Sequence, residues 1–294
     1  MTGQLKDFLA TRKQVIEETL PTFIQKLNTT QSLKNAMLYS LEAGGKRLRP
    51  VLVLALLHTY KKPERNGLAT ACAIEMIHTY SLIHDDLPCM DDDDLRRGKP
   101  TNHKVFGEAL AVLAGDSLLT ESFSIIVNDP NCPSEQKLRL ITELVKAAGA
   151  EGMVGGQVLD MEGEAKELSL LELQHIHENK TAKLLAYSLL AGGILAGAPE
   201  CDIENLRKIG YHLGIAFQIR DDILDIEGSE DRIGKPVGSD SVNEKNTYPK
   251  LLTMQGAKDK LNDHTSQAQN FIMDLTVEAP LLLEMCELIA NRDH

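Results

Sequence analysis

The sequence predicts an all-α fold, and three observations lead to that prediction. Apolar residues recur at intervals of three and four between positions 138 and 148, which is the spacing of one helix face. Alternation of apolar and polar residues, which is typical of strands, is almost absent. Ser169 and Glu172 have the spacing of a capping box, which starts a helix. We therefore expect a bundle of helices.

Helices are expected in order wherever the apolar spacing is helical and a cap, Gly or Pro marks an end. The expected ranges are 4–27, 32–43, 49–60, 65–88, 104–127, 134–148, 150–161, 169–197, 202–226, 248–276 and 280–291. Segments 109–119 and 184–195 are apolar around most of their circumference, so we expect them to be central, covered by a second layer or by a partner chain. No long linker rich in Pro, Gly or Ser interrupts the chain, which predicts one domain over residues 1–294.

Composition excludes several classes of function. The 294 residues carry a formal net charge of −12, so a broad basic surface for duplex nucleic acid or anionic lipid is not expected. The longest uninterrupted apolar run, 51–57, is far shorter than the roughly 20 residues of a membrane span, and the first 20 residues lack the pattern of an export signal. The five cysteines include no C-x-x-C pair, which favours reduced thiols and a cytoplasmic location.

Two acid-rich segments follow apolar helical sequence. In the first, Asp85 and Asp91 are six residues apart and would diverge by roughly 240° on a regular helix. Pro88 lies between them, and a proline that distorts the turn could bring Asp91 back toward Asp85. In the second, Asp221 and Asp225 are one helical turn apart and can hold the same ion. Taken alone, either segment could equally be a solvated acidic face.

Basic residues adjoin both acidic segments. Arg96 and Arg97 follow the first, and Lys235 follows the second. Carboxylate oxygens suit Mg²⁺, which is often shared between protein carboxylates and a substrate phosphate, and arginine binds the remaining phosphate oxygens. Segment 44–50 supplies Lys46 and Arg49, which could also be ordinary surface cations. It is not a nucleotide-binding loop, because Ser40 and Arg47 stand where that motif has a glycine and a hydroxyl residue.

Several polar residues interrupt apolar helices and need partners. His78 lies two turns before Asp85, where it could be a ligand or a satisfied core histidine. The segments Asn179-Lys180-Thr181 and Gln218-Ile219-Arg220 also place polar side chains in apolar surroundings, and a bound ligand could satisfy them.

The chain resembles the trans-isoprenyl diphosphate synthases over roughly residues 40–250. The resemblance is carried by both aspartate motifs together with segments 44–50, 95–101, Lys180-Thr181 and 234–236, which follow one another along the chain in the order usual for that family. The resemblance implies the isoprenoid synthase fold: an all-α homodimer of about ten core helices around a deep central cavity, with the aspartate motifs facing each other. It also implies a transferase that joins isopentenyl diphosphate to an allylic diphosphate with three Mg²⁺ ions. The C-terminal residues are less basic than the tails that close the site in some relatives, so no role is assigned to them.

The resemblance also implies roles for individual residues. The principal metal ligands would be Asp85, Asp91 and Asp221, with Asp86, Asp222 and Asp225 acting directly or through water. The diphosphate of isopentenyl diphosphate would be held by Lys46, Arg49, His78 and Arg97. The allylic diphosphate would be held by Arg96, Lys180 and Lys235, and Thr181 and Gln218 would lie beside its carbon chain.

Product length is expected to depend on the residues just before the first motif. Ser81 lies one turn before Asp85, and the ring of Tyr80 would cap the growing chain at C15, although Tyr80 could instead be plain core. The pattern here looks like that of bacterial C15 synthases. The alternatives are a geranylgeranyl or other chain-length synthase, a terpene cyclase and a non-catalytic helical metal-binding module. Segment 104–127 is the expected surface for pairing protomers, because it looks too apolar for solvent.

Overall fold

The computed structural model describes residues 2–164, 166–227 and 246–292, and within these ranges helices dominate. The all-α prediction is therefore confirmed. The elements are α1 (Gly3–Gln25), α2 (Gln31–Leu41), α3 (Leu48–Thr59), η1 (Glu64–Gly67), α4 (Leu68–Asp85), β1 (Leu95–Arg96), β2 (Lys99–Pro100), α5 (Asn102–Phe106), α6 (Glu108–Val127), α7 (Ser134–Ala148), α8 (Met153–Gly163), α9 (Leu170–His177), η2 (Glu178–Ala182), α10 (Lys183–Ala196), α11 (Glu200–Glu227), α14 (Tyr248–Met273) and α15 (Pro280–Asn291).

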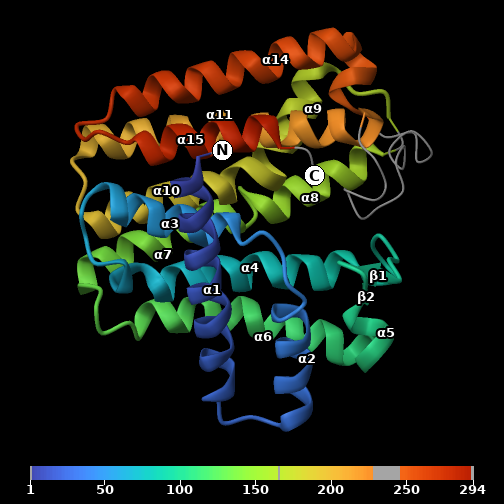
Figure 1. The fold of residues 1–294 in the computed structure, drawn as a ribbon. Coiled ribbons are helices and arrows are strands. Elements are labelled where there is room, and N and C mark those ends of the chain that lie inside the picture. Colours follow the sequence, from blue (N-terminus) through green and yellow to red (C-terminus); the bar gives the residue numbers. More distant parts are fainter. Residues whose placement is uncertain (1, 165, 228–245, 293–294) are drawn as a thin grey trace.

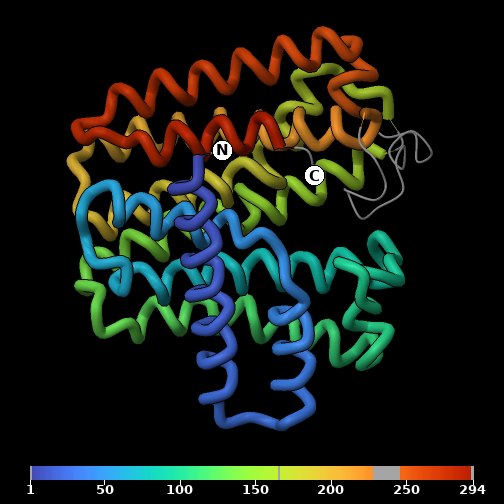
Figure 2. Tube along the Cα trace, in the orientation of Figure 1, coloured from blue at the N-terminus to red at the C-terminus, as the bar shows by residue number. Residues whose placement is uncertain are grey.

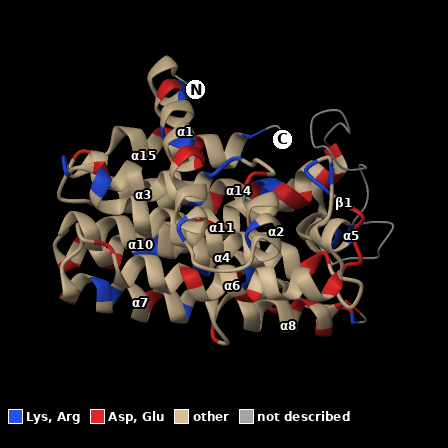
Figure 3. Ribbon diagram, turned by 90° about the horizontal axis from the view of Figure 1, so that it is seen from below, with Lys and Arg blue, Asp and Glu red and all other residues tan. Residues whose placement is uncertain are grey.

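The long helices are stacked in successive layers, with α14 at one side of the molecule and α6 at the other (Figure 1). Helix α11 packs against α14 and α10, α10 packs against α3, and α4 packs against α3 and α6. Helix α1 crosses this stack, and α2 returns beside it in the opposite direction (Figure 2). Acidic and basic positions are scattered along helices that are mostly uncharged, and several acidic ones lie at the end that carries β1 and α5 (Figure 3).

Helices α3 and α10 form the centre of the bundle. Residues 50–57 of α3 are all buried, and so is nearly all of α10. Helices that are apolar all round are stable only when neighbours cover every face, and α3, α7 and α11 cover α10 here. The predicted central position of segment 184–195 is thus confirmed.

Helix α6 is not enclosed in the same way within one chain, so no second layer covers all of segment 109–119, and its cover by a partner chain stays a prediction. Its Ala111, Ala114 and Leu118 face the core, whereas Val112 is 38% exposed and Leu113 is 54% exposed. The reason is that α4 and α2 cover only one side of the helix. By length and composition α6 could also cross a membrane, although core helices of soluble proteins pass the same test and a third of its apolar stretch is buried.

Several predicted boundaries are corrected. The expected helix 65–88 begins with the short helix η1 and stops at Asp85, and the expected helix 104–127 is divided at Gly107, whose φ of 82° does not fit a helix. The expected helix 169–197 starts at the predicted capping box of Ser169 and Glu172 but contains a π-helical turn, η2. The hairpin of β1 and β2 was not predicted, because two-residue strands leave no alternating pattern. The single domain over residues 1–294 stays a prediction.

Candidate active site

The first aspartate motif begins where α4 ends. The helix stops at Asp85, and the chain then turns through Pro88 so that the backbone N–H of Asp91 donates a hydrogen bond to the carbonyl of Asp85 at 2.8 Å. Asp91 is therefore brought back beside Asp85, although the helix ends here and is not merely kinked. A helix end followed by a tight turn thus presents two carboxylates to the same region.

Burial and charge set the electrostatics of this motif. Burial raises the pKa of Asp85 to about 6, nearby Lys180 opposes the rise, and Asp91 adds to it. Burial also raises the pKa of Asp86, although Arg96 opposes this by donating to its carboxylate. Asp86 is only 3% exposed and points at Arg96 rather than into the open cavity. Asp85 is thus a carboxylate whose charge is costly until a cation approaches.

The second aspartate motif lies on α11, and its members differ in exposure. Asp221 lines a cavity of about 180 Å³, and its side chain is 44% exposed. Asp222 is 7% exposed, and its Oδ2 accepts a hydrogen bond from the backbone N–H of Tyr248 at 2.9 Å. Asp225 follows one turn after Asp221 on the same helix. Asp222 therefore also ties α11 to the start of α14.

The two motifs line adjoining cavities that share wall residues. The part beside Asp221 shares Lys180 and Gln218 with a larger part of about 540 Å³ that Asp85 lines. Lys180 forms an ion pair with Asp160 of α8 at 2.5 Å. Asp160 was not identified from the sequence, because a single carboxylate within an apolar helix gives no distinctive signal. The cavity therefore places a lysine between carboxylates of three helices.

Lys180 and Thr181 belong to the π-helical turn η2, which packs against α8. Gly156 of α8 makes the close approach possible, because a Cβ atom there would lie 2.2 Å from the backbone nitrogen of Lys180. π-helical turns insert one extra residue into a helix and are frequent at functional sites. The contact between Gly156 and η2 thus helps to fix where Lys180 and Thr181 lie.

Residues 45–49 of the basic stretch line a third, adjoining compartment of about 490 Å³, which shares Arg49, His78 and Phe217 with the part beside Asp85. The turn depends on residues with positive φ: Gly44 at 86°, Gly45 at 130° and Arg47 at 51°. A Cβ atom on Gly45 would also lie 2.7 Å from the guanidinium carbon of Arg97, which donates to the carbonyl of Gly44. The positive φ therefore requires glycine at position 45, whereas the guanidinium of Arg97 is the end of a flexible side chain and could move.

Burial dominates the protonation of this basic region. It lowers the pKa of Arg49 and brings the pKa of His78 well below its ordinary value, with neighbouring Arg49 adding to the effect on His78. His78 is therefore neutral at pH 7. The Nε atom of Arg49 is buried without a hydrogen-bond partner, which leaves a donor for a ligand.

The structure places the residues that are predicted to limit product length on the cavity wall. Tyr80 and Ser81 line the 540 Å³ part, and the rings of Tyr80 and His84 pack edge to face with centroids 5.7 Å apart. Tyr80 is 6% exposed, and burial raises the pKa of its hydroxyl to about 12. Lys235 lies outside the described residues.

Arg292, which was given no role from the sequence, lies in the site. It lines the same part of the cavity as Lys46 and Arg49 and forms an ion pair with Asp221. Its position next to α11 results from the folding back of α15, which sequence spacing does not reveal.

The part of the chain that the structure describes contains no group of three or more His, Cys, Asp or Glu side chains that could hold a metal ion by itself. Each motif instead supplies one or two carboxylates. Such a donor set fits Mg²⁺, which keeps several waters and shares its remaining positions with substrate phosphate.

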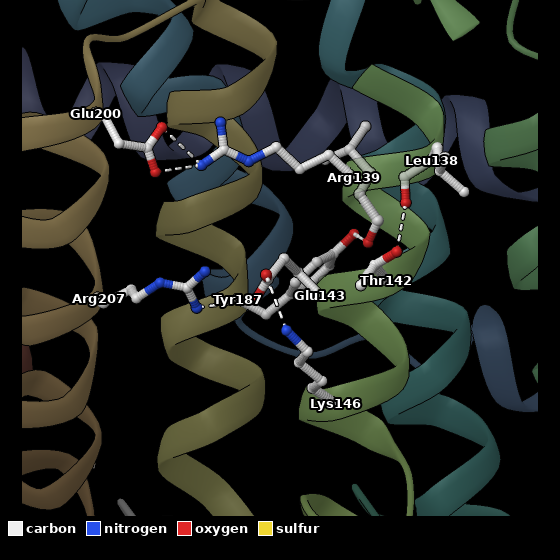
Figure 4. A network of polar contacts seen from close by, with 9 residues as sticks. Leu138, Arg139, Thr142, Glu143, Lys146, Tyr187, Glu200 and Arg207 are labelled. Carbon is white, nitrogen blue, oxygen red and sulfur yellow. Dashed lines mark hydrogen bonds and ion pairs between the residues drawn. The ribbon is translucent and has the colours of Figure 1, made fainter. Parts of the chain in front are cut away.

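A second polar network lies away from this cavity (Figure 4). Glu143 of α7 accepts hydrogen bonds from Arg207 and Lys146, and Arg139 binds Glu200. The hydrogen bond from Arg207 lowers the pKa of Glu143. A cavity of about 360 Å³ adjoins it, but its walls carry three basic and three acidic residues, so charge selects no ligand there.

Comparison with known proteins agrees with this geometry. The chain is 62% identical to farnesyl diphosphate synthase of Bacillus subtilis over the whole of both chains. It is 47% identical to a chloroplastic geranylgeranyl pyrophosphate synthase of Capsicum annuum, over 89% of this chain and 72% of that one.

Among solved structures, an FPP/GFPP synthase from Zymomonas mobilis superposes with a TM-score of 0.87 at 34% identity, over 99% of this chain and all of the other. A Helicobacter pylori geranyltransferase, solved in complex with magnesium and isoprenyl diphosphate, superposes with a TM-score of 0.81 at 35% identity, over 97% and 96% of the two chains. Residues 30–276 match the family described as polyprenyl synthetase, and the chain belongs to that family.

Proposed function

We propose that this protein joins isopentenyl diphosphate head to tail to dimethylallyl and geranyl diphosphate, which yields farnesyl diphosphate and inorganic diphosphate. The observation that carries the proposal is the pair of adjoining cavities in which Asp85 and Asp221 lie on either side of the shared Lys180, next to a compartment lined by Arg49 and His78. Relatives named farnesyl diphosphate synthase, at 62%, 56% and 49% identity, support the chain length.

Magnesium is the metal that the carboxylates suit. Asp85, Asp91 and Asp221 would be the principal ligands of three ions, and Asp86, Asp222 and Asp225 would support them. The raised pKa of Asp85 fits this role, because a bound cation would relieve the cost of its buried charge. When bound, magnesium stabilises the negative charge that develops on a departing diphosphate. The complex of the Helicobacter pylori relative with magnesium supports the choice of metal.

The allylic diphosphate would be bound by Lys180, Arg96 and Lys235. Lys180 already lies beside Asp85 and Asp160, where a diphosphate bound with metal would replace part of its ionic environment. Arg96 uses Nε and Nη2 to bind Asp86 and Asp93, and its Nη1 would reach a diphosphate oxygen. These cations stabilise the leaving group as the allylic C–O bond breaks.

Isopentenyl diphosphate would be bound by Lys46, Arg49, His78 and Arg97. A neutral His78 can donate one hydrogen bond to a phosphate oxygen without adding charge. The shared wall of the two compartments would bring the isopentenyl double bond close to the allylic carbon.

The reaction needs a dry channel, because water would capture the allylic cation. Apolar side chains of α8, including Val154 and Val158, line the cavity wall beside Thr181 and Gln218. Thr181 and Gln218 would lie along the carbon chain and orient it. The released diphosphate is the proposed base for the last proton, so no side chain is assigned that role.

Tyr80 would end the channel and set the product at C15. Its buried ring packs on His84 at the cavity wall, and Ser81 lies beside it. A geranylgeranyl synthase is the second candidate, and it is favoured by a relative of that name at 47% identity. The terpene cyclase and the non-catalytic module have no such support.

We also propose a homodimer that buries the exposed side of α6, where Val112, Leu113 and Val127 are 38 to 54% exposed. An apolar face of this kind commonly marks a protein interface. A cytoplasmic location is proposed as well, and all five cysteines being free supports it.

The test incubates the protein with isopentenyl diphosphate, Mg²⁺ and each allylic primer in turn, followed by chromatography of the products. Dimethylallyl and geranyl diphosphate should both give C15. Chelation of the metal should abolish turnover. A dominant C20 product would favour the second candidate, and no product with any primer would refute the proposal.

A further inference from the structure

The third compartment of the cavity is crowded with positive charge. Lys46, Arg47, Arg49, Arg97 and Arg292 all line it, and Glu75 is the one carboxylate among its described lining residues. Such an arrangement attracts an anion, but arginines held together also repel one another before the anion arrives. Something in the fold must hold them in place in the absence of ligand.

Glu75 is positioned to do so from the core. It lies on α4, three residues before His78 and therefore on the same side of the helix, and it is only 2% exposed. Its Oε1 accepts a hydrogen bond from Nη1 of Arg47 at 2.5 Å, and Arg47 is itself only 3% exposed. A buried carboxylate and a buried guanidinium are tolerated together because each offsets the charge of the other.

Arg47 in turn fixes the turn that carries the ligand-binding residues. Its Nη2 donates to the carbonyl of Leu41 at the end of α2, and its backbone is in the left-handed region between Lys46 and Leu48. A non-glycine residue keeps that conformation only where its surroundings hold it. Arg47 is therefore committed to Glu75 and Leu41, with the half-buried carboxylate of Glu17 at 3.5 Å from its Nε, whereas Lys46 and Arg49 on either side face the cavity.

Glu75 also acts on the neighbouring arginines through space. Burial lowers the pKa of Arg49 and of Arg97, and for both residues Glu75 is the strongest opposing influence. In the described ion pairs Glu75 binds neither of them, so it does not occupy their donors, although Arg97 donates to the carbonyl of Gly44.

We propose that Glu75 is a positioning residue for isopentenyl diphosphate: it anchors Arg47 and thereby holds Lys46 and Arg49 in the geometry that binds the diphosphate. The inference depends on the proposed function, since it concerns the isopentenyl compartment of that site. The positioning role predicts the opposite change in affinity from the one that electrostatic attraction alone predicts. Removing a negative charge from an anion site should tighten binding if the turn stays in place, whereas loss of an anchor should weaken it.

The experiment compares Glu75→Gln with Glu75→Asp, which keeps the charge on a shorter stem. For Glu75→Gln, the KM for isopentenyl diphosphate should rise at least about tenfold while that for geranyl diphosphate stays within about twofold. Glu75→Asp should recover part of the loss. A lower or unchanged KM for isopentenyl diphosphate, or an equal rise for both substrates, would overturn the proposal.

A matched control separates positioning from general destabilisation. Asp202 is also a fully buried carboxylate, bonded to Tyr60 and Thr276 and not part of the cavity wall. Asp202→Asn should lower the melting temperature without changing the ratio of the two KM values. If Glu75→Gln fails to fold, Arg47→Lys replaces it in the test. The lysine keeps a cation for Glu75 but cannot also reach the carbonyl of Leu41. This variant should raise the KM for isopentenyl diphosphate about threefold.

Calorimetry of isopentenyl diphosphate alone with the free protein gives a readout that needs no turnover. Wild-type protein that binds this ligand but forms no product refutes the proposed function and leaves the role of Glu75 to be decided by the affinities of the variants. Wild-type protein that does not bind it refutes both.

Discussion

Arg292 pairs with the exposed aspartate of the second motif: its Nη2 lies 2.5 Å from Oδ1 of Asp221. The guanidinium also lies 3.7 Å from the centroid of the Phe217 ring, and its Nη2 donates to the carbonyl of Phe217. An arginine thus neutralises a proposed metal ligand while it lines the compartment of the second substrate.

The first prediction follows from this pair. Because magnesium must compete with the guanidinium for Asp221, Arg292→Gln should lower the Mg²⁺ concentration for half-maximal activity by about threefold to tenfold, or about 0.7 to 1.4 kcal/mol. The same change should raise the KM for isopentenyl diphosphate. Magnesium titrations of initial rates measure the first effect. Arg139→Gln, which removes a pair with Glu200 outside the cavity, serves as the control and should alter neither.

A second prediction concerns the raised pKa of Asp85. The pKa of Asp85 is about 6 in the folded protein, against an ordinary value of 3.8. Between these two pH values the folded state binds the proton more tightly than the unfolded state does. The free energy of unfolding therefore falls as the pH rises through this range. Without metal at pH 7.5, Asp85→Asn should therefore stabilise the protein by about 1 to 3 kcal/mol while activity falls at least about a thousandfold.

The stabilisation should shrink as the pH falls from 6 toward 4, because the wild-type carboxyl then becomes protonated in the folded protein. Thermal unfolding of both proteins across this range measures it. A difference that does not depend on pH would show that Asp85 is not strained by its charge.

A third prediction concerns product length. Tyr80→Ala should remove the end of the channel and give products longer than C15, whereas Ser81→Phe should narrow the channel and favour C10. Chromatography of the dephosphorylated products measures both. If both variants still give only C15, the boundary lies elsewhere in the cavity.

A fourth prediction tests the contact between α8 and η2. A Cβ atom at Gly156 would lie 2.6 Å from the Cα of Lys180, so Gly156→Ala must displace the backbone that carries this lysine. We expect about 1 to 3 kcal/mol of destabilisation and a higher KM for the allylic substrate. Gly163→Ala on the same helix meets only flexible leucine and isoleucine methyl groups at 3.1 Å or more, so it should change little. Equal KM values in the two variants would contradict the argument.

Sequence patterns were sufficient for the fold class and for most of the helices, whereas the roles of the site residues stay predictions. The spacing of apolar residues specifies helix faces locally, and Pro88 correctly indicated that the chain leaves the helix between Asp85 and Asp91. For α6 the sequence left open whether a second layer or a partner chain covers it, because an apolar segment looks the same in both cases, and the structure shows that one side is uncovered within a single chain.

The missed residues share a physical reason. Glu75, Asp160 and Arg292 act through partners far away in the sequence, namely Arg47, Lys180 and Asp221. Local spacing carries no information about such pairs, and only the packing of α4, α8 and α15 brings them together. The same limit applies to Asp86, whose carboxylate binds Arg96 instead of facing the open cavity.

The π-helical turn at Glu178–Ala182 has a consequence for how the family can vary. Because the wide turn accommodates one extra residue, a deletion of one residue there would restore uninterrupted α-helical winding from Leu170 to Ala196, keep the flanking helices in register and remove the turn that carries Lys180. Lys180 would then lose its present place on the cavity wall although no side chain that lines the cavity had been substituted. Gaps and insertions in this short segment are therefore more informative about loss of activity than amino-acid replacements on either side of it.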